Sequence, residues 1–163
     1  MKFSAAIKGL ITSILMIAIF LVAYYLFPKA NSEIQYLVYI IYALGIVWSV
    51  IAYRQSAAFT GKFRDVFSQG FKCFIIVTLG IALFYGIFNY WHPEFAEQTA
   101  KAYREQLNEL VAKNQKLPTD VEPEVATFKK QYTLRLISGA IFGYLIIGTA
   151  ITAVASVFLT KRK

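Results

Sequence analysis

The sequence predicts an all-α membrane protein, a four-transmembrane-helix bundle. It also predicts an extramembrane helical hairpin between the third and fourth spans and a short amphipathic helix before the third. Composition is the first reason: 58% of the 163 residues are hydrophobic and only 16% are charged, whereas soluble domains carry about 25% charged residues. The second reason is that four long stretches hold no charge, so all 17 basic and 9 acidic residues lie outside them.

The four uncharged stretches are long enough to cross a bilayer. They cover residues 9–27, 34–53, 73–91 and 136–160. A hydrocarbon core about 30 Å thick requires about 20 apolar residues in a helix, and lipid forces the backbone groups to pair within the segment. Buried helices of a soluble core are the alternative, but too little polar chain is left to cover four of them. We expect one integral membrane domain over residues 1–163.

Basic residues are concentrated on one side of the predicted topology. Both termini and the second loop share that side, which carries nine Lys and Arg residues against Asp65 alone, a net charge of +8. The opposite side carries eight basic and eight acidic residues. Because basic loops stay inside, we expect both termini to be cytoplasmic. The basic residues would contact anionic lipid headgroups, and we expect no nucleic-acid binding.

The loop before the third span has an amphipathic pattern. Phe63, Phe67 and Phe71 recur every fourth residue, which places them on one face of a helix. The basic residues of this segment fall largely elsewhere, and they are Lys62, Arg64 and Lys72. Such a helix suits the membrane interface, and we predict one over residues 60–72 with a bend near Gly70. A packed extension of the third span is the alternative.

Residues 92–135 are predicted to form an antiparallel helical hairpin. Its first helix follows Pro93 and carries an apolar seam with alternating spacings of four and three, formed by Ala96, Ala100, Tyr103, Leu107, Leu110, Asn114 and Leu117. This spacing is typical of a helix that packs on another helix. Pro118 ends it, and a second helix begins near Pro123 and continues into the fourth span. We expect the seam to pack within the hairpin, with a partner chain as the alternative.

Small residues spaced by four indicate close helix packing. Gly139 and Gly143 form such a pair in the fourth span, and Gly9 and Gly86 belong to similar patterns in the first and third. Small residues at this spacing let helices approach each other closely. The contacts would lie either within the bundle or between subunits.

No reactive constellation is predicted. The chain holds one His and one Cys, so we expect no catalytic residue, no cofactor and no metal site. The four uncharged stretches also lack Asp, Glu, Lys, Arg and His, which argues against a proton-coupled transporter. A pore or lipid site lined by hydroxyl and amide side chains stays open, and its candidates are Thr12, Ser13, Thr78, Asn89, Ser138, Thr149, Thr152 and Ser156.

Several sequence features together match a known pattern. Lys8-Gly9 opens the first span, a Tyr-rich second span ends in Arg54, and residues 63–72 lead into the third. A long charged loop then precedes a Gly-rich fourth span beginning near Gly139. The chain resembles, over nearly its whole length, the membrane family known as domain of unknown function 4199, which is typical of Bacteroidetes. The resemblance implies four spans and an inner-membrane location, and it supplies no catalytic residues.

These observations favour a non-enzymatic scaffold or accessory subunit of the inner membrane. We expect two partners: the lipid bilayer, and either a second copy of the chain or another membrane protein. The alternatives are a lipid or small-molecule transporter or channel component, and a helper of a membrane enzyme acting on lipid-linked sugars.

Overall fold

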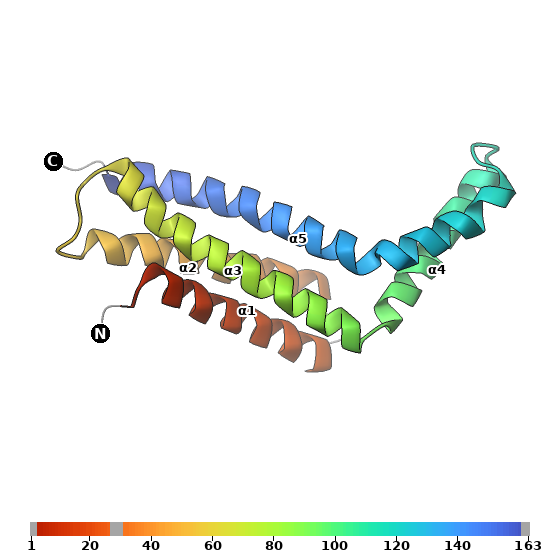
Figure 1. Cartoon of the computed structure of the whole chain (residues 1–163), viewed down its shortest axis with the longest axis horizontal. Coiled ribbons are helices and arrows are strands. Elements are labelled where there is room, and N and C mark those ends of the chain that lie inside the picture. The colour runs from red at the N-terminus through yellow and green to blue at the C-terminus, as the bar shows by residue number, and fades with distance from the viewer. Residues whose placement is uncertain (1–2, 27–30, 161–163) are drawn as a thin grey trace. The chain divides into compact units, whose positions relative to one another are not determined.

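The computed structural model describes residues 3–26 and 31–160, and every regular element in these ranges is helical (Figure 1). This confirms the all-α fold class. The elements are α1 (Ala5–Leu26), α2 (Asn31–Arg54), α3 (Phe63–Trp91), α4 (Glu94–Ala112), the short 3₁₀ helix η1 (Pro118–Asp120) and α5 (Val121–Thr160).

Four of these helices are long and apolar enough to cross a membrane, as predicted. The candidate spans lie within Ala5–Leu26, Tyr36–Arg54, Phe63–Trp91 and Pro118–Thr160. The helices are longer than the uncharged stretches. With 29 residues, α3 is about 43 Å long at 1.5 Å per residue, and α5, with 40 residues, is about 60 Å long. The second hairpin helix and the fourth span are therefore one continuous helix.

The chain divides into two compact units. One unit, here the bundle unit, comprises Met1–Ala82 and Ala140–Lys163, and the other, the hairpin unit, comprises Leu83–Gly139. The bundle unit thus contains α1, α2, most of α3 and the C-terminal half of α5. The hairpin unit contains the end of α3, α4, η1 and the N-terminal half of α5.

Close backbone approach defines the core of the bundle unit. A Cβ built on Gly9 would lie 2.5 Å from the carbonyl oxygen of Cys73, and one on Gly80 would lie 2.9 Å from the side chain of Ser13. Gly45, Gly70 and Gly148 face equally close neighbours. Large side chains fill the remaining space, and those fully buried include Met16, Tyr42, Ile46, Val50, Val66, Phe74 and Val77.

Three buried polar side chains of this core, Thr12, Ser13 and Thr78, bond to their own helix. Thr12 donates to the carbonyl of Lys8 at 2.8 Å, and Thr78 donates to that of Phe74 at 2.8 Å. Such back-bonding satisfies a hydroxyl without a partner from another helix. Thr152 Oγ1 and Ser156 Oγ, in α5, are buried and have no hydrogen-bond partner among the residues that the structure describes.

The separate amphipathic helix predicted over residues 60–72 is wrong. Gly61 has φ +72°, which no residue of a right-handed helix adopts, so α3 begins at Phe63 and then runs without interruption to Trp91 (Figure 1). Gly70 is no bend. A Cβ there would lie 2.5 Å from Cγ2 of Thr152 and 3.1 Å from Val50, so this glycine lets α3 approach α5 and α2.

The seam of α4 packs against the start of α5 within the hairpin unit. Ala100 and Leu107 form a buried cluster with Val121 and Val125. Tyr103, Val111 and Phe128 pack against this cluster, and the rings of Tyr103 and Phe128 stack with centroids 4.5 Å apart. The predicted continuation through Leu110 and Leu117 is wrong, since these two side chains are exposed.

Asn114, not Pro118, ends α4. Its φ is +54°, in the left-handed region that Asn tolerates better than most residues. The N–H of Gln115 donates to the carbonyl of Leu110, and the N–H of Asn114 donates to that of Val111, both at 2.9 Å. These two bonds form a Schellman motif, so the seam stops one turn earlier than its spacing predicts.

Candidate functional site

A cleft of about 380 Å³ opens in the bundle unit where α1 begins and α2 ends. It is lined by Phe3, Ser4, Ala5, Lys8, Trp48, Ser49, Ala52, Tyr53, Gln55, Ser56 and Gln69. Small-molecule sites have volumes of about 300–1,000 Å³ and combine apolar walls with a few polar groups. No carboxylate is among the lining residues. The cleft therefore has the size and composition of a ligand site.

Lys8 is the charged group of this cleft. It lies near the start of α1, only 7% of its surface is exposed, and its Nζ is 5.7 Å from the centroid of the Trp48 ring. Within residues 3–26 and 31–160, no carboxylate forms an ion pair with it. The four uncharged stretches still hold no ionisable residue, and Lys8 lies one residue before the first of them. The uncharged stretch begins at residue 9, but the helix that contains it begins at Ala5.

Several polar groups of the cleft have their protons committed elsewhere. Ser49 donates to the carbonyl of Gln69 at 3.3 Å, Ser56 to that of Tyr53 at 2.7 Å, and the hydroxyl of Tyr53 to the carbonyl of Ala58 at 3.0 Å. The first bond joins α2 to α3, and the other two fix the loop after α2. The Ser4 hydroxyl accepts the N–H of Ile7 at 3.3 Å, so its own proton remains to be donated. The cleft thus presents this hydroxyl, the Lys8 ammonium and the amides of Gln55 and Gln69 as donors.

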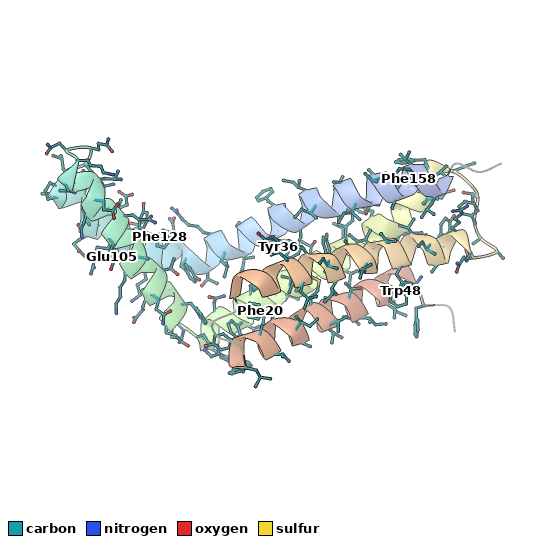
Figure 2. The ribbon with its side chains drawn as sticks, turned by 180° about the vertical axis from the view of Figure 1, so that it is seen from behind. Phe20, Tyr36, Trp48, Glu105, Phe128 and Phe158 are labelled. Carbon is teal, nitrogen blue, oxygen red and sulfur yellow. The ribbon has the colours of Figure 1, made fainter. Side chains whose placement is uncertain are left out.

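A second surface follows the outer face of α5. Gly143, Ile146, Ala150, Val154 and Val157 recur at spacings of three and four, and each is exposed or half-buried. Beside this face runs an apolar groove of about 500 Å³ between α2 and α5. Its lining residues are Val47, Ile51, Ala150, Ile151, Val154, Ala155, Phe158 and Leu159. Phe158, labelled in Figure 2, is 74% exposed.

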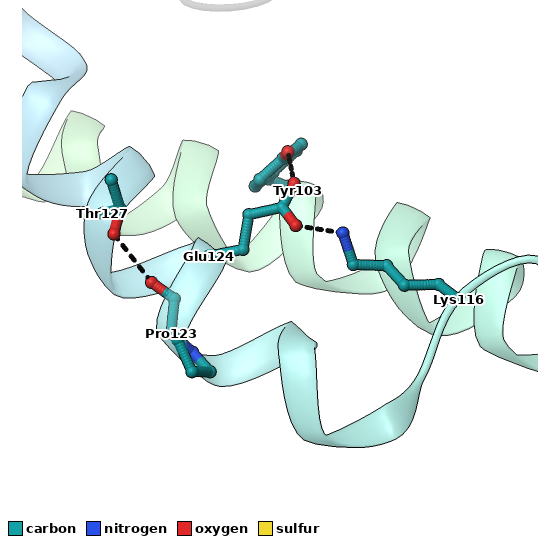
Figure 3. A network of polar contacts seen from close by, with 5 residues as sticks. All are labelled: Tyr103, Lys116, Pro123, Glu124 and Thr127. Atoms are coloured by element: carbon teal, nitrogen blue, oxygen red, sulfur yellow. Dashed lines mark hydrogen bonds and ion pairs between the residues drawn. The ribbon is translucent and has the colours of Figure 1, made fainter.

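The hairpin unit carries a polar network. Glu124 accepts the hydroxyl of Tyr103 at 2.5 Å and pairs with Lys116 (Figure 3). Arg104 pairs with Glu122 at 2.7 Å, and Lys129 pairs with Glu97 at 2.8 Å. These contacts join α4 and the loop after it to α5, so their role is to hold the hairpin closed.

This network shifts the acid–base equilibria of its members. Two hydrogen bonds lower the pKa of Glu124. The charged hydrogen bond from Lys116 has the larger effect, and the hydrogen bond from Tyr103 has the smaller. The same contact with Glu124 raises the pKa of Lys116. The hydrogen bond to Glu124 also raises the pKa of Tyr103, because the hydroxyl must keep its proton to donate it.

His92 has a carboxylate neighbour that sequence reasoning missed. Its Nδ1 lies 2.7 Å from Oε1 of Glu94, and the Phe88 ring centroid lies 4.5 Å from that of the imidazole. Two hydrogen bonds lower the pKa of Glu94. The larger effect comes from the backbone N–H of Glu94 itself, and the smaller comes from His92. In the described part of the chain, no group of three or more His, Cys, Asp or Glu side chains comes together to hold a metal ion.

Comparison with known proteins gives a family. A family model described as "Protein of unknown function (DUF4199)" matches residues 8–161, which is nearly the whole chain. The chain belongs to the DUF4199 family. Searches of curated proteins and of solved structures return no match. The DUF4199 match confirms the predicted resemblance and covers all four candidate spans and the hairpin unit.

The structure brings the predicted site residues of this DUF4199 chain into three different environments. Gly9 lies at a close approach to α3, whereas Gly86 has only ordinary contact with Ile137 at 3.5 Å. Gly139 and Gly143 have nothing within 4 Å of a built Cβ among the described residues. The described residues therefore provide no contact within the chain for this pair, and the other alternative, a contact between subunits, stays a prediction.

The aromatic row at the start of α3 points outward. Adjacent rings of Phe63, Phe67 and Phe71 stack with centroids 5.7 and 6.3 Å apart, and Phe63 and Phe71 are 44% and 45% exposed. Their basic neighbours Lys62, Arg64 and Lys72 are exposed as well. The segment thus combines a packed side, through Val66 and Gly70, with an aromatic and basic outer side. Contact of the outer side with anionic lipid stays a prediction.

Two features of the site were missed from the sequence. The Lys8 cleft joins residues from three segments of the chain, and no local pattern marks it. The packing glycines Gly45 and Gly148 do have a signal, since Gly45 and Ser49 are spaced by four, as are Gly148, Thr152 and Ser156. All five of these residues are buried in the bundle unit.

Proposed function

We propose that this DUF4199 chain is a non-enzymatic scaffold or accessory subunit of a bacterial inner membrane, with both termini in the cytoplasm. In this proposal it forms one integral membrane domain that associates with another membrane helix through the outer face of α5. The observation that carries the proposal is the open glycine face of this helix. Gly143, like Gly139 one turn before it, has no heavy atom within 4 Å of a built Cβ in the described part of the chain.

Glycine at such a position favours a helix as the neighbour over lipid. Lipid chains adapt to any side chain, whereas two helices approach closely only where the side chains are small. Ala150 continues the small face two turns after Gly143, and the apolar groove between α2 and α5 lies alongside it. A partner helix seated there would contact small residues at its centre and Phe158 at its edge.

Co-purification tests this function. The full chain, extracted in mild detergent, is expected to retain a stoichiometric membrane-protein partner, and Gly143→Leu is expected to release it while leaving the thermal unfolding midpoint of the chain itself unchanged. Thr149→Leu is the matched control, because Thr149 is exposed on another side of α5. Equal partner retention by wild type and Gly143→Leu would contradict the proposal.

The second candidate is a lipid or small-molecule transporter or channel component, and the polar cleft at Lys8 favours it. The same purification separates the two. A pure homo-oligomer whose assembly survives Gly143→Leu, and which moves lipid between leaflets in vesicles, would support the transporter over the scaffold.

A further inference from the structure

The Lys8 side chain poses an electrostatic problem that the protein itself does not solve. An ammonium group removed from water is costly unless an anion or several acceptors surround it. Lys8 is 93% buried by area, as only 7% is exposed, and its recorded partner is the Trp48 ring at 5.7 Å. Among the described residues no carboxylate pairs with it. An anion in the cleft would compensate this charge.

The groups around Lys8 also select for an anion. The Ser4 hydroxyl and the amides of Gln55 and Gln69 line the same cleft and can donate hydrogen bonds. Lysine with neutral donors around it is a common means of binding phosphate. A cation would find no carboxylate among the lining residues. Apolar side chains line the cleft as well, namely Phe3, Trp48 and Ala52, and they are here called its apolar wall.

We infer that this cleft binds a phosphate group, and that the phosphate is the headgroup of an anionic lipid. The phosphate would accept hydrogen bonds from Lys8, Ser4 and the two amides, and the apolar wall would contact the glycerol backbone and the start of the acyl chains. The volume of about 380 Å³ is more than a bare phosphate needs. Exposed basic residues of the same unit, among them Arg64 and Lys72, add attraction for anionic lipid. This inference does not depend on the proposed scaffold function.

Native mass spectrometry of the full chain in detergent tests the inference. With phosphatidylglycerol added, we expect one tightly held lipid per chain, and Lys8→Met is expected to weaken its binding about 10- to 100-fold, the loss of one charged hydrogen bond. Lys8→Arg is expected to restore binding. Lys130→Met is the matched control, since it removes the same charge from an exposed lysine of the hairpin unit. It is expected to bind phosphatidylglycerol as wild type does.

Two further arms distinguish the source of the phosphate. Phosphatidylcholine, whose phosphate is neutralised within the headgroup, is expected to bind more weakly than phosphatidylglycerol and with no dependence on Lys8. Inorganic phosphate is expected to leave the thermal unfolding midpoint of lipid-free protein unchanged. If inorganic phosphate raises the midpoint of the wild type but not that of Lys8→Met, the cleft does bind phosphate. The inference that this phosphate belongs to a lipid would then be wrong.

A structural role for Lys8 predicts different results. If Lys8 serves only to pack on Trp48, Lys8→Met lowers the unfolding midpoint of lipid-free protein and leaves lipid retention unchanged in the molecules that fold. Gln55→Leu guards against a folding defect at position 8, because it removes a donor of the cleft without touching α1. Phosphatidylglycerol binding that survives both Lys8→Met and Gln55→Leu would overturn the inference.

Discussion

Glycines in the bundle unit have two different environments, although the sequence gives both kinds the same spacing. Gly148 lies under the hydroxyl of Tyr42 and the ring of Phe74. That hydroxyl is held in place, because it donates to the carbonyl of Tyr144 at 2.8 Å. Gly143, five residues earlier in the same helix, faces open space in the described structure. One helix therefore supplies a packed glycine and an open glycine for comparison.

Gly148→Ala is expected to destabilise the chain by about 1–3 kcal/mol, because overpacking forces well-packed neighbours to move. The new Cβ would lie 2.8 Å from Cγ of Phe74. Helix propensity acts in the opposite direction by about 1 kcal/mol, so Gly143→Ala, the matched control, is expected to be neutral or slightly stabilising. Thermal unfolding in detergent measures both. Equal midpoints for the two variants would show that Gly148 is not at a close approach.

Sequence spacing alone could not separate these two glycines. Small-xxx-small spacing indicates that one face of a helix carries small side chains. It does not indicate whether that face turns toward the chain's own helices or away from them. Gly139 and Gly143 match the pattern as well as Gly148 and Thr152 do. The deciding information is which face of α5 meets α2 and α3, and this depends on contacts between residues about 70 to 100 positions apart, such as that of Tyr42 with Tyr144.

At the scale of elements, hydrophobic patterns predicted the existence of helices better than their ends. The start of α3 depends on the left-handed conformation of Gly61, and the end of α4 depends on that of Asn114. Neither conformation can be read from periodicity. The seam of α4 was predicted through Ala100, Tyr103 and Leu107, and these residues do face α5. Beyond Leu107, the Schellman motif determines where α4 ends and how the chain continues, and the apolar spacing does not.

The hairpin unit is expected to lose stability in acid. The pKa of Glu124 is lowered from its ordinary value of 4.5. A carboxylate with a lowered pKa in the folded state stabilises the fold above its ordinary pKa, and this contribution is lost as the pH falls through the lowered value. Amide hydrogen exchange over residues 121–128, corrected for the intrinsic rate, is therefore expected to show weaker protection at pH 3 than at pH 7.

Glu124→Gln is expected to reduce this pH dependence, because the amide does not titrate and cannot pair with Lys116. Some dependence remains, since the bond from Lys129 also lowers the pKa of Glu97. Glu105→Gln is the control. Glu105 is exposed on α4 (Figure 2) and makes no ion pair within the described residues. High salt is expected to weaken the effect in wild type, because Lys116 and Glu124 are partly exposed to solvent. A pH dependence equal in Glu124→Gln and Glu105→Gln would contradict the assignment to Glu124.

For the whole molecule, charge asymmetry is the property that the sequence expresses most directly. The candidate spans expose many large apolar side chains, as at Leu83, Phe142 and Phe158, which is expected of a protein whose solvent is lipid. The four candidate spans were therefore predictable from composition and run length. The Lys8 cleft was not, because it exists only once the ends of α1 and α2 and the start of α3 are brought together.

Orientation in the membrane follows from this asymmetry and can be measured. Nine basic residues against one acidic residue on the terminal side, and eight against eight on the other, predict that residues 54–72 are cytoplasmic and residues 92–135 are external. In a Cys73→Ser background, Lys113→Cys is expected to react with a membrane-impermeant thiol reagent in intact cells. Lys62→Cys is expected to react only after the cells are permeabilised. Both lysines are exposed in the structure, so accessibility to the reagent, and not burial in the protein, determines the result. Labelling of Lys62→Cys but not Lys113→Cys in intact cells would invert the topology, and it would place the cleft of Lys8 at the outer leaflet.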